Sequence, residues 1–140
     1  MVTRIITLAT FASFLVLGQL HAEEEESPLH EKMEEVNRSL KLLRRAGEDY
    51  EKAAGLVRQA QTLMLECFAF VPATIEKMPE GKERNIAWAN YRKTMAQSYQ
   101  TLCDLELAYI SGDLDQIDDA MDEVKGLRKE GHEEYIEENA

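Results

Sequence analysis

The sequence predicts an all-α protein, an antiparallel up-down-up-down four-helix bundle preceded by a signal peptide. Its 140 residues include only 7 Gly and 3 Pro, and long stretches rich in Glu, Leu, Ala, Lys and Met pass without a helix breaker. Apolar residues recur at helical spacing in four segments joined by short connections, which places consecutive helices side by side. The length suits one small domain.

The first segment is expected to be a secretory signal peptide. A basic residue, Arg4, precedes the apolar run Ile5–Leu17, and Ala22 supplies a small residue at the expected cleavage site. The run is shorter than the roughly 18 residues that span a bilayer as a helix. We therefore expect residues 1–22 to be removed on export to the periplasm, leaving residues 23–140 as a bundle domain without membrane insertion. An uncleaved anchor is the alternative.

The first two helices carry wide apolar stripes. Ser27 is the expected N-cap of the first helix, Pro28 takes its first position and Gly47 its end. Its stripe is Leu29, Met33, Val36, Leu40 and Leu43. The second helix is expected from Asp49 to Phe70, with an inward stripe of Tyr50, Ala53, Val57, Ala60, Met64 and Cys67, flanked by Leu56, Leu63 and Phe70.

A connecting loop separates the second helix from the third. Two prolines and a glycine punctuate Val71–Lys82, which is too short for another domain. The third helix is expected from Glu83 to Ser111 and carries most of the aromatic surface. Its stripe is Ile86, Trp88, Tyr91, Met95, Tyr99, Leu102, Leu105 and Tyr109.

The fourth helix ends with polar residues on its apolar face. Asp113 and Gln116 form a capping-box pattern after the turn at Gly112, and the helix is expected to end near Glu138. Its inward stripe is Leu114, Ile117, Met121 and Val124, and the same face continues to Arg128, His132 and Tyr135. Burying a cation and an imidazole costs several kcal/mol unless they are paired, so we expect this end of the bundle to hold a partner group.

Composition and motifs exclude several classes of function. The formal charge of −11, from 27 acidic and 16 basic residues, would repel a phosphate backbone and excludes nucleic-acid partners. The sequence contains no Gly-rich phosphate loop, no GxSxG and no CxxC, and no nucleophile stands with a base. We therefore do not expect an enzyme.

The two cysteines are expected to stay unbridged. Cys67 near the end of the second helix and Cys103 late in the third would lie roughly 25 Å apart along the bundle axis. The Cα–Cα distance across a disulfide does not exceed about 7 Å. Both are predicted to be buried thiols.

A sulfur and an imidazole meet at one end of the expected bundle. In an antiparallel bundle, Met33 near the start of the first helix stands level with His132 near the end of the last. A thioether and an imidazole facing each other are the axial pair of low-spin haem iron. The sequence resembles the soluble cytochrome b562 family of haem-b four-helix bundles, on residues 29–37 (LHEKMEEVN) and 127–135 (LRKEGHEEY).

This resemblance implies an electron carrier with one non-covalent haem b per chain. By position, Met33 and His132 are similar to the family's axial iron ligands, and Arg128 matches its Arg one turn before the His. Tyr91 and Met95 fall where the family places phenylalanines against the porphyrin, which is a departure from its pattern. The absence of CxxCH argues against covalent attachment of the haem. The expected partner is a redox protein, which the acidic helix faces would steer if it is basic; simple solvated surface is the other interpretation.

Three alternatives remain open on the sequence. The chain could be a haem-free exported bundle that binds a partner, with Arg128 paired to Glu31 or Glu34 and His132 facing solvent. It could be a loose metal binder, since the imidazoles of His30 and His132 with the Met33 thioether and a neighbouring Glu suit copper. His30 is also a rival haem ligand, because it lies three residues before Met33.

Overall fold

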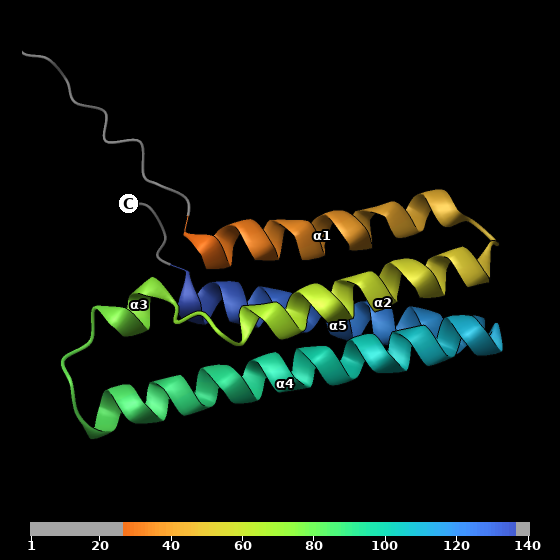
Figure 1. The fold of residues 1–140 in the computed structure, drawn as a ribbon. Coiled ribbons are helices and arrows are strands. Elements are labelled where there is room, and N and C mark those ends of the chain that lie inside the picture. Colours follow the sequence, from red (N-terminus) through yellow and green to blue (C-terminus); the bar gives the residue numbers. More distant parts are fainter. Residues whose placement is uncertain (1–26, 137–140) are drawn as a thin grey trace, which may run out of the picture.

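The structure, a computed structural model, describes residues 27–136 of the chain. This part of the chain contains five helices and no strand. The helices are α1 (Pro28–Ala46), α2 (Tyr50–Cys67), α3 (Ala73–Glu76), α4 (Lys82–Ser111) and α5 (Leu114–Tyr135), and the four long ones lie lengthwise beside one another in a helical bundle (Figure 1). The expected signal peptide, residues 1–22, lies outside the described residues.

The helix ends follow the predicted capping chemistry. Ser27 Oγ accepts a hydrogen bond from the His30 backbone N–H at 3.2 Å, and Asp113 Oδ1 accepts one from the Gln116 N–H at 3.1 Å. The Gln116 side chain also donates to Asp113 Oδ2 at 2.6 Å. Gly47 and Gly112 end α1 and α4 with positive φ of 57° and 69°, which a residue without Cβ adopts at little cost. These caps satisfy backbone groups that the helices leave unpaired.

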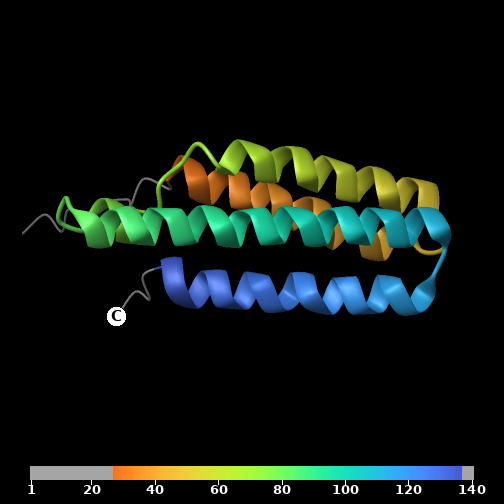
Figure 2. The same cartoon turned by 90° about the horizontal axis from the view of Figure 1, so that it is seen from below.

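The bundle is closed along three helix pairs and open along the fourth. α1 packs on α2, α2 on α4 and α4 on α5, whereas no Cα atom of α1 lies within 8 Å of one of α5. Lys32 Nζ pairs with Glu66 Oε2 at 2.9 Å between α1 and α2, and Tyr91 and Tyr135 stack between α4 and α5. We call the uncovered strip between α1 and α5 the α1–α5 seam. Figure 2 shows the same helices from below.

A short helix lies across the end of the bundle where α5 ends. The segment between α2 and α4, predicted as a loop, contains the one-turn helix α3, which packs against both α4 and α5. Ile75 is buried there, and Thr74 Oγ donates a hydrogen bond to the backbone carbonyl of Tyr135 at 3.2 Å. The loop prediction was wrong at this turn because an apolar side chain and a tertiary hydrogen bond, rather than local sequence, hold it helical.

The core consists of the predicted inward stripes with a few exceptions. Its largest fully buried side chains are Leu102, Leu105, Val57 and Cys67. Two predicted core positions are wrong, because Ile86 and Leu114 are 49% and 62% exposed. Ile86 lies in the second turn of α4 and Leu114 at the first position of α5, near helix starts where fewer neighbouring residues cover a side chain.

Two helices end earlier than the sequence predicts. α2 ends at Cys67 instead of Phe70, and α5 ends at Tyr135 instead of near Glu138; residues 137–140 lie outside the described part. Cys67 and Cys103 are both free, as predicted. Cys67 is buried, but Cys103 is only half-buried, which corrects the prediction that both thiols are enclosed. Within the described residues, no helix is both long and apolar enough to cross a membrane.

Candidate functional site

The candidate site lies at the end of the bundle where α1 begins and α5 ends (Figure 1). The two helices bring His30 and Glu34 close enough to His132 to interact with it electrostatically. Met33 lies on the same turn of α1 and is half-buried against the core. The structure therefore places His132 within electrostatic reach of the turn of α1 that contains Met33.

His132 and Arg128 are exposed, which corrects the expectation that they occupy core positions. The physical reason is the width of the α1–α5 seam, since side chains of α5 that face α1 are not covered by it. No described ion pair joins Arg128 to Glu31 or Glu34, the pairing expected of a haem-free bundle. Both polar side chains therefore stand at the rim of the seam.

The environment of His132 favours its neutral form. The pKa of this imidazole is lowered, mainly because its ring is partly covered and also because the Arg128 guanidinium lies nearby; Glu34 acts in the opposite direction. Neutral imidazole is the form that binds a metal ion. His132 is therefore prepared for ligation at neutral pH.

At the same end of the bundle, Tyr91 and Met95 of α4 are buried, and Tyr91 contacts Tyr135 of α5. Tyr91 and Met95 are each 3% exposed. The Tyr91 ring stacks edge-to-face on Tyr135 with centroids 5.1 Å apart, and it lies 6.5 Å from the ring of Trp88. Aromatic rings and a thioether make an apolar, polarizable surface that suits a flat ligand.

One buried hydroxyl at this end lacks a hydrogen-bond partner. Among the described residues, Tyr91 Oη has none, whereas Tyr135 has Thr94 and Glu134 beside it, which act on its pKa through hydrogen bonding. Burial raises the pKa of Tyr91 far above its ordinary value, with smaller contributions from Cys67 and Tyr135, so this hydroxyl keeps its proton and remains a donor. A buried donor without an acceptor costs about 1–3 kcal/mol, and such groups are uncommon in native proteins. The Tyr91 hydroxyl therefore points to a polar atom of a ligand at this end.

The sequence did not single out Tyr135 as part of this site. It lies three residues after His132, on the same face of α5, and that spacing was the available signal. Its contact with Tyr91 depends on how α4 and α5 pack.

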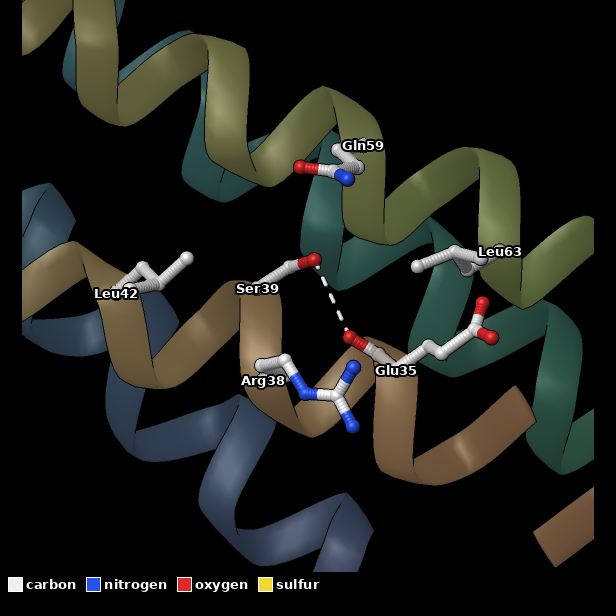
Figure 3. Close-up of a pocket in the computed structure, with 6 residues that line it drawn as sticks. All are labelled: Glu35, Arg38, Ser39, Leu42, Gln59 and Leu63. Atoms are coloured by element: carbon white, nitrogen blue, oxygen red, sulfur yellow. Dashed lines mark hydrogen bonds between the residues drawn. The ribbon is translucent and has the colours of Figure 1, made fainter. Parts of the chain in front are cut away.

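A shallow pocket between α1 and α2 does not compete with this site. It encloses about 190 Å³ and is lined by Glu35, Arg38, Ser39, Leu42, Gln59 and Leu63 (Figure 3). Ser39 Oγ donates its hydrogen bond to the Glu35 backbone carbonyl at 3.2 Å, so the hydroxyl is already used. The volume is below the roughly 300–1,000 Å³ of small-molecule sites.

The described residues do not assemble the loose metal site either. No group of three His, Cys, Asp or Glu side chains in residues 27–136 could hold a metal ion. His30, His132 and a neighbouring Glu therefore do not form such a group by themselves; the fourth member of the copper alternative, the Met33 thioether, is of another residue type.

Together these features define an α-helical bundle with a candidate site for a flat, largely apolar cofactor at one end. A sequence model of the cytochrome b562 family matches residues 28–135, most of the chain, and the protein belongs to this family. No match is found among curated proteins or among solved structures. The family consists of cytochromes that bind haem b non-covalently and carry electrons.

The residues at the site fit such a group. A thioether and a neutral imidazole lie on facing helices, the two donors that low-spin haem iron takes on its two faces. Tyr91 and Met95 supply a buried surface, and the Tyr91 hydroxyl has a proton to donate. No Cα atom of α1 lies within 8 Å of one of α5, so the two donor helices do not pack closely against each other.

Proposed function

We propose that this chain is a periplasmic electron carrier that binds one haem b non-covalently between α1 and α5. Met33 and His132 are its axial ligands. The observation that carries the proposal is that His132 of α5 interacts electrostatically with His30 and Glu34, the neighbours of Met33 on α1, although the two helices do not pack against each other. A haem iron held by Met and His supplies a one-electron redox couple and leaves no coordination position for a substrate.

The side chains around the ligands have separate roles. His132 binds through a neutral imidazole, which its lowered pKa favours. Arg128, one turn before it, offers a guanidinium to an acidic edge of the group. Tyr91 and Met95 pack against the flat face and exclude water, while the Tyr91 hydroxyl donates a hydrogen bond.

The proposal includes the topology and the export of the chain. The pairs Lys32–Glu66, Tyr50–Tyr109 and Tyr91–Tyr135 each join the early part of one helix to the late part of another, and they support an antiparallel up-down-up-down order of the four long helices. The start of the chain supports a cleaved signal peptide over residues 1–22, with residues 23–140 as the mature bundle domain. A redox partner protein completes the proposed function.

Reconstitution with haemin tests the proposal. We expect the full-length protein to retain haem through gel filtration and to show sharp α and β bands when reduced. A Met-to-iron charge-transfer band in the oxidised protein should disappear in Met33→Ala and persist in His30→Ala. A protein that loses haem on the column is not a cytochrome, and loss of the band in His30→Ala would assign the ligand differently.

His30 is the rival that this experiment must separate from Met33. It lies on the same helix turn and interacts electrostatically with His132. A bis-His iron would lack the charge-transfer band in the unmutated protein. Its spectrum would then change in His30→Ala and stay constant in Met33→Ala.

A further inference from the structure

The end of α4 and the first half of α5 are strongly acidic. Between Lys93 and Lys125 the sequence contains eight Asp or Glu residues and no Lys or Arg. This stretch spans the end of α4, the turn at Gly112 and the first half of α5. Two of its carboxylates are in described ion pairs, Asp122 with Lys125 at 2.7 Å and Glu106 with Arg58 of α2 at 2.7 Å.

Two of the most exposed apolar side chains of the described residues lie in this acidic stretch. Leu107 and Ile110 of α4 are 62% and 63% exposed. They are three residues apart and share one face of the helix; the half-buried Cys103 and Tyr99 lie one and two turns before Leu107. An apolar stripe therefore runs along this face of α4, partly covered at Tyr99 and Cys103 and exposed at Leu107 and Ile110.

A groove between α4 and α5 adjoins this stripe. It encloses about 280 Å³ and is lined by Asp104, Leu107, Gln116, Asp119, Ala120 and Glu123. Leu107 and the buried Ala120 give it an apolar base, and three carboxylates border it. The groove is smaller than the roughly 300–1,000 Å³ of small-molecule sites, and it suits single side chains of a protein partner.

Charge decides which partner this surface fits. A second copy of the chain would place the same carboxylates against one another, and anionic membranes and nucleic acids would be repelled. A partner with Lys or Arg around an apolar centre complements both the border and the base of the groove.

We propose that Leu107, Ile110 and the adjoining acidic groove form a docking surface for a basic, amphipathic helical segment of a partner protein. The apolar side chains of that segment lie on Leu107 and Ile110, and its cations face Asp104, Asp119 and Glu123. The surface is separate from the candidate haem site, because Asp119 and His132 are thirteen residues apart on α5, about 20 Å along the helix. The inference therefore stands without the proposed function.

A pair of synthetic peptides tests the docking surface. The probe is a fluorescent 18-residue helix with Leu on one face and Lys on the other, and the comparison peptide carries Gln in place of each Leu. Binding to the full-length protein is followed by fluorescence anisotropy at low and high salt. We expect the Leu/Lys peptide to bind more tightly than the Gln/Lys peptide, with equal affinity in the presence and absence of haemin and more weakly at high salt.

Matched variants locate the binding. L107Q/I110Q and D119N/E123Q should each weaken the binding of the Leu/Lys peptide by about tenfold. The controls are L65Q, which changes a 52% exposed apolar side chain on α2, and E76Q/E80Q, which changes two exposed carboxylates near α3. These controls should change the affinity by less than about twofold.

Four results would overturn the inference. They are no binding of the Leu/Lys peptide, equal binding of the two peptides, equal losses in test and control variants, and a dimer in solution that L107Q/I110Q dissociates. The last result would show that this surface binds a second copy of the chain instead of a basic partner. None of them bears on haem retention, so failure of the docking surface is distinguishable from failure of the proposed function.

Discussion

The α2–α4 interface and the α1–α5 seam use the same kinds of residues in different ways. Between α2 and α4, Val57, Leu102 and Leu105 are almost fully buried, and the polar Gln61 among them is paired. Its Nε2 donates to the Leu102 carbonyl at 3.2 Å and to Glu106 at 2.7 Å. At the end of the bundle beside the seam, Met33 is half-buried, His132 is exposed, and the Tyr91 hydroxyl has no hydrogen-bond partner among residues 27–136.

The difference separates an interface that stabilises the bundle from the end at which we propose that haem binds. Close-packed apolar side chains with paired polar groups gain their full contribution from the chain alone. Met33, His132 and the Tyr91 hydroxyl, by contrast, should contribute fully to stability only when a further group is bound beside them. We therefore expect mutations at the two regions to respond oppositely to haemin.

Truncation of Leu105 should have the largest effect. Leu105→Ala removes a fully buried side chain and should lower the free energy of unfolding by about 2–5 kcal/mol, measured by urea denaturation without haemin. Met33→Ala should cost clearly less because Met33 is half-buried. The control Leu107→Ala, at a 62% exposed position, should stay within about 0.5 kcal/mol. Equal losses at Leu105 and Met33 would contradict the comparison.

Haemin should stabilise the protein, and this stabilisation should depend on residues beside the α1–α5 seam and not on residues of the α2–α4 interface. At a free concentration one hundred times its Kd, haemin should raise the free energy of unfolding by about 2.7 kcal/mol. Leu105→Ala should keep this increment, whereas His132→Ala should lose most of it at the same haemin concentration. Thermal melts with and without haemin measure both. An increment that survives His132→Ala would place the binding elsewhere.

Removal of a polar group should change the free energy of unfolding in opposite directions in the two regions. Gln61→Leu removes the hydrogen bonds from Gln61 Nε2 to the Leu102 carbonyl and to Glu106 Oε2 and should cost about 1–3 kcal/mol. Tyr91→Phe removes a hydroxyl that has no partner among the described residues, so the haem-free protein should be unchanged or up to about 1 kcal/mol more stable. Urea denaturation of both variants without haemin tests this. A clear loss of stability in Tyr91→Phe would reveal a hydrogen bond.

The smallest expected effect is a difference in pH dependence. The pKa of His132 is below its ordinary 6.5, mainly through partial burial, so the unfolded chain binds more protons just below pH 6.5 and the stability contributed by His132 is lost as the pH falls. The pKa of Glu106 is below its ordinary 4.5 because Arg58 donates a hydrogen bond to it, and its contribution is lost only below that value.

Two variants separate the pH-dependent contributions of His132 and Glu106 to stability. Without haemin, His132→Gln should flatten the pH dependence of the free energy of unfolding just below pH 6.5, and Glu106→Gln should flatten it below pH 4.5. Urea denaturation across this range measures both. A decrease below pH 6.5 that persists in His132→Gln would assign it to other groups.

Much of the site could be predicted because its residues follow regular helical spacing. The interval from Pro28 to Met33 and the position of His132 near the chain end sufficed to place them at one level in a bundle with short connections. Their exposure could not be predicted. Periodicity gives the face of a helix on which a residue lies, but how closely another helix approaches that face depends on every packed side chain along both. Arg128, His132 and Leu114 were assigned to the core for this reason.

The sequence alone determined the four long helices, their caps at Ser27, Asp49 and Asp113, and most of the core, because these depend on neighbours within a few residues. Tertiary structure decided the rest. It separated α1 from α5, brought Tyr135 onto Tyr91, folded α3 against both α4 and α5, and left Leu107 and Ile110 uncovered. Each of these depends on contacts between residues far apart in the chain, and local propensity and spacing carry no information about such distances.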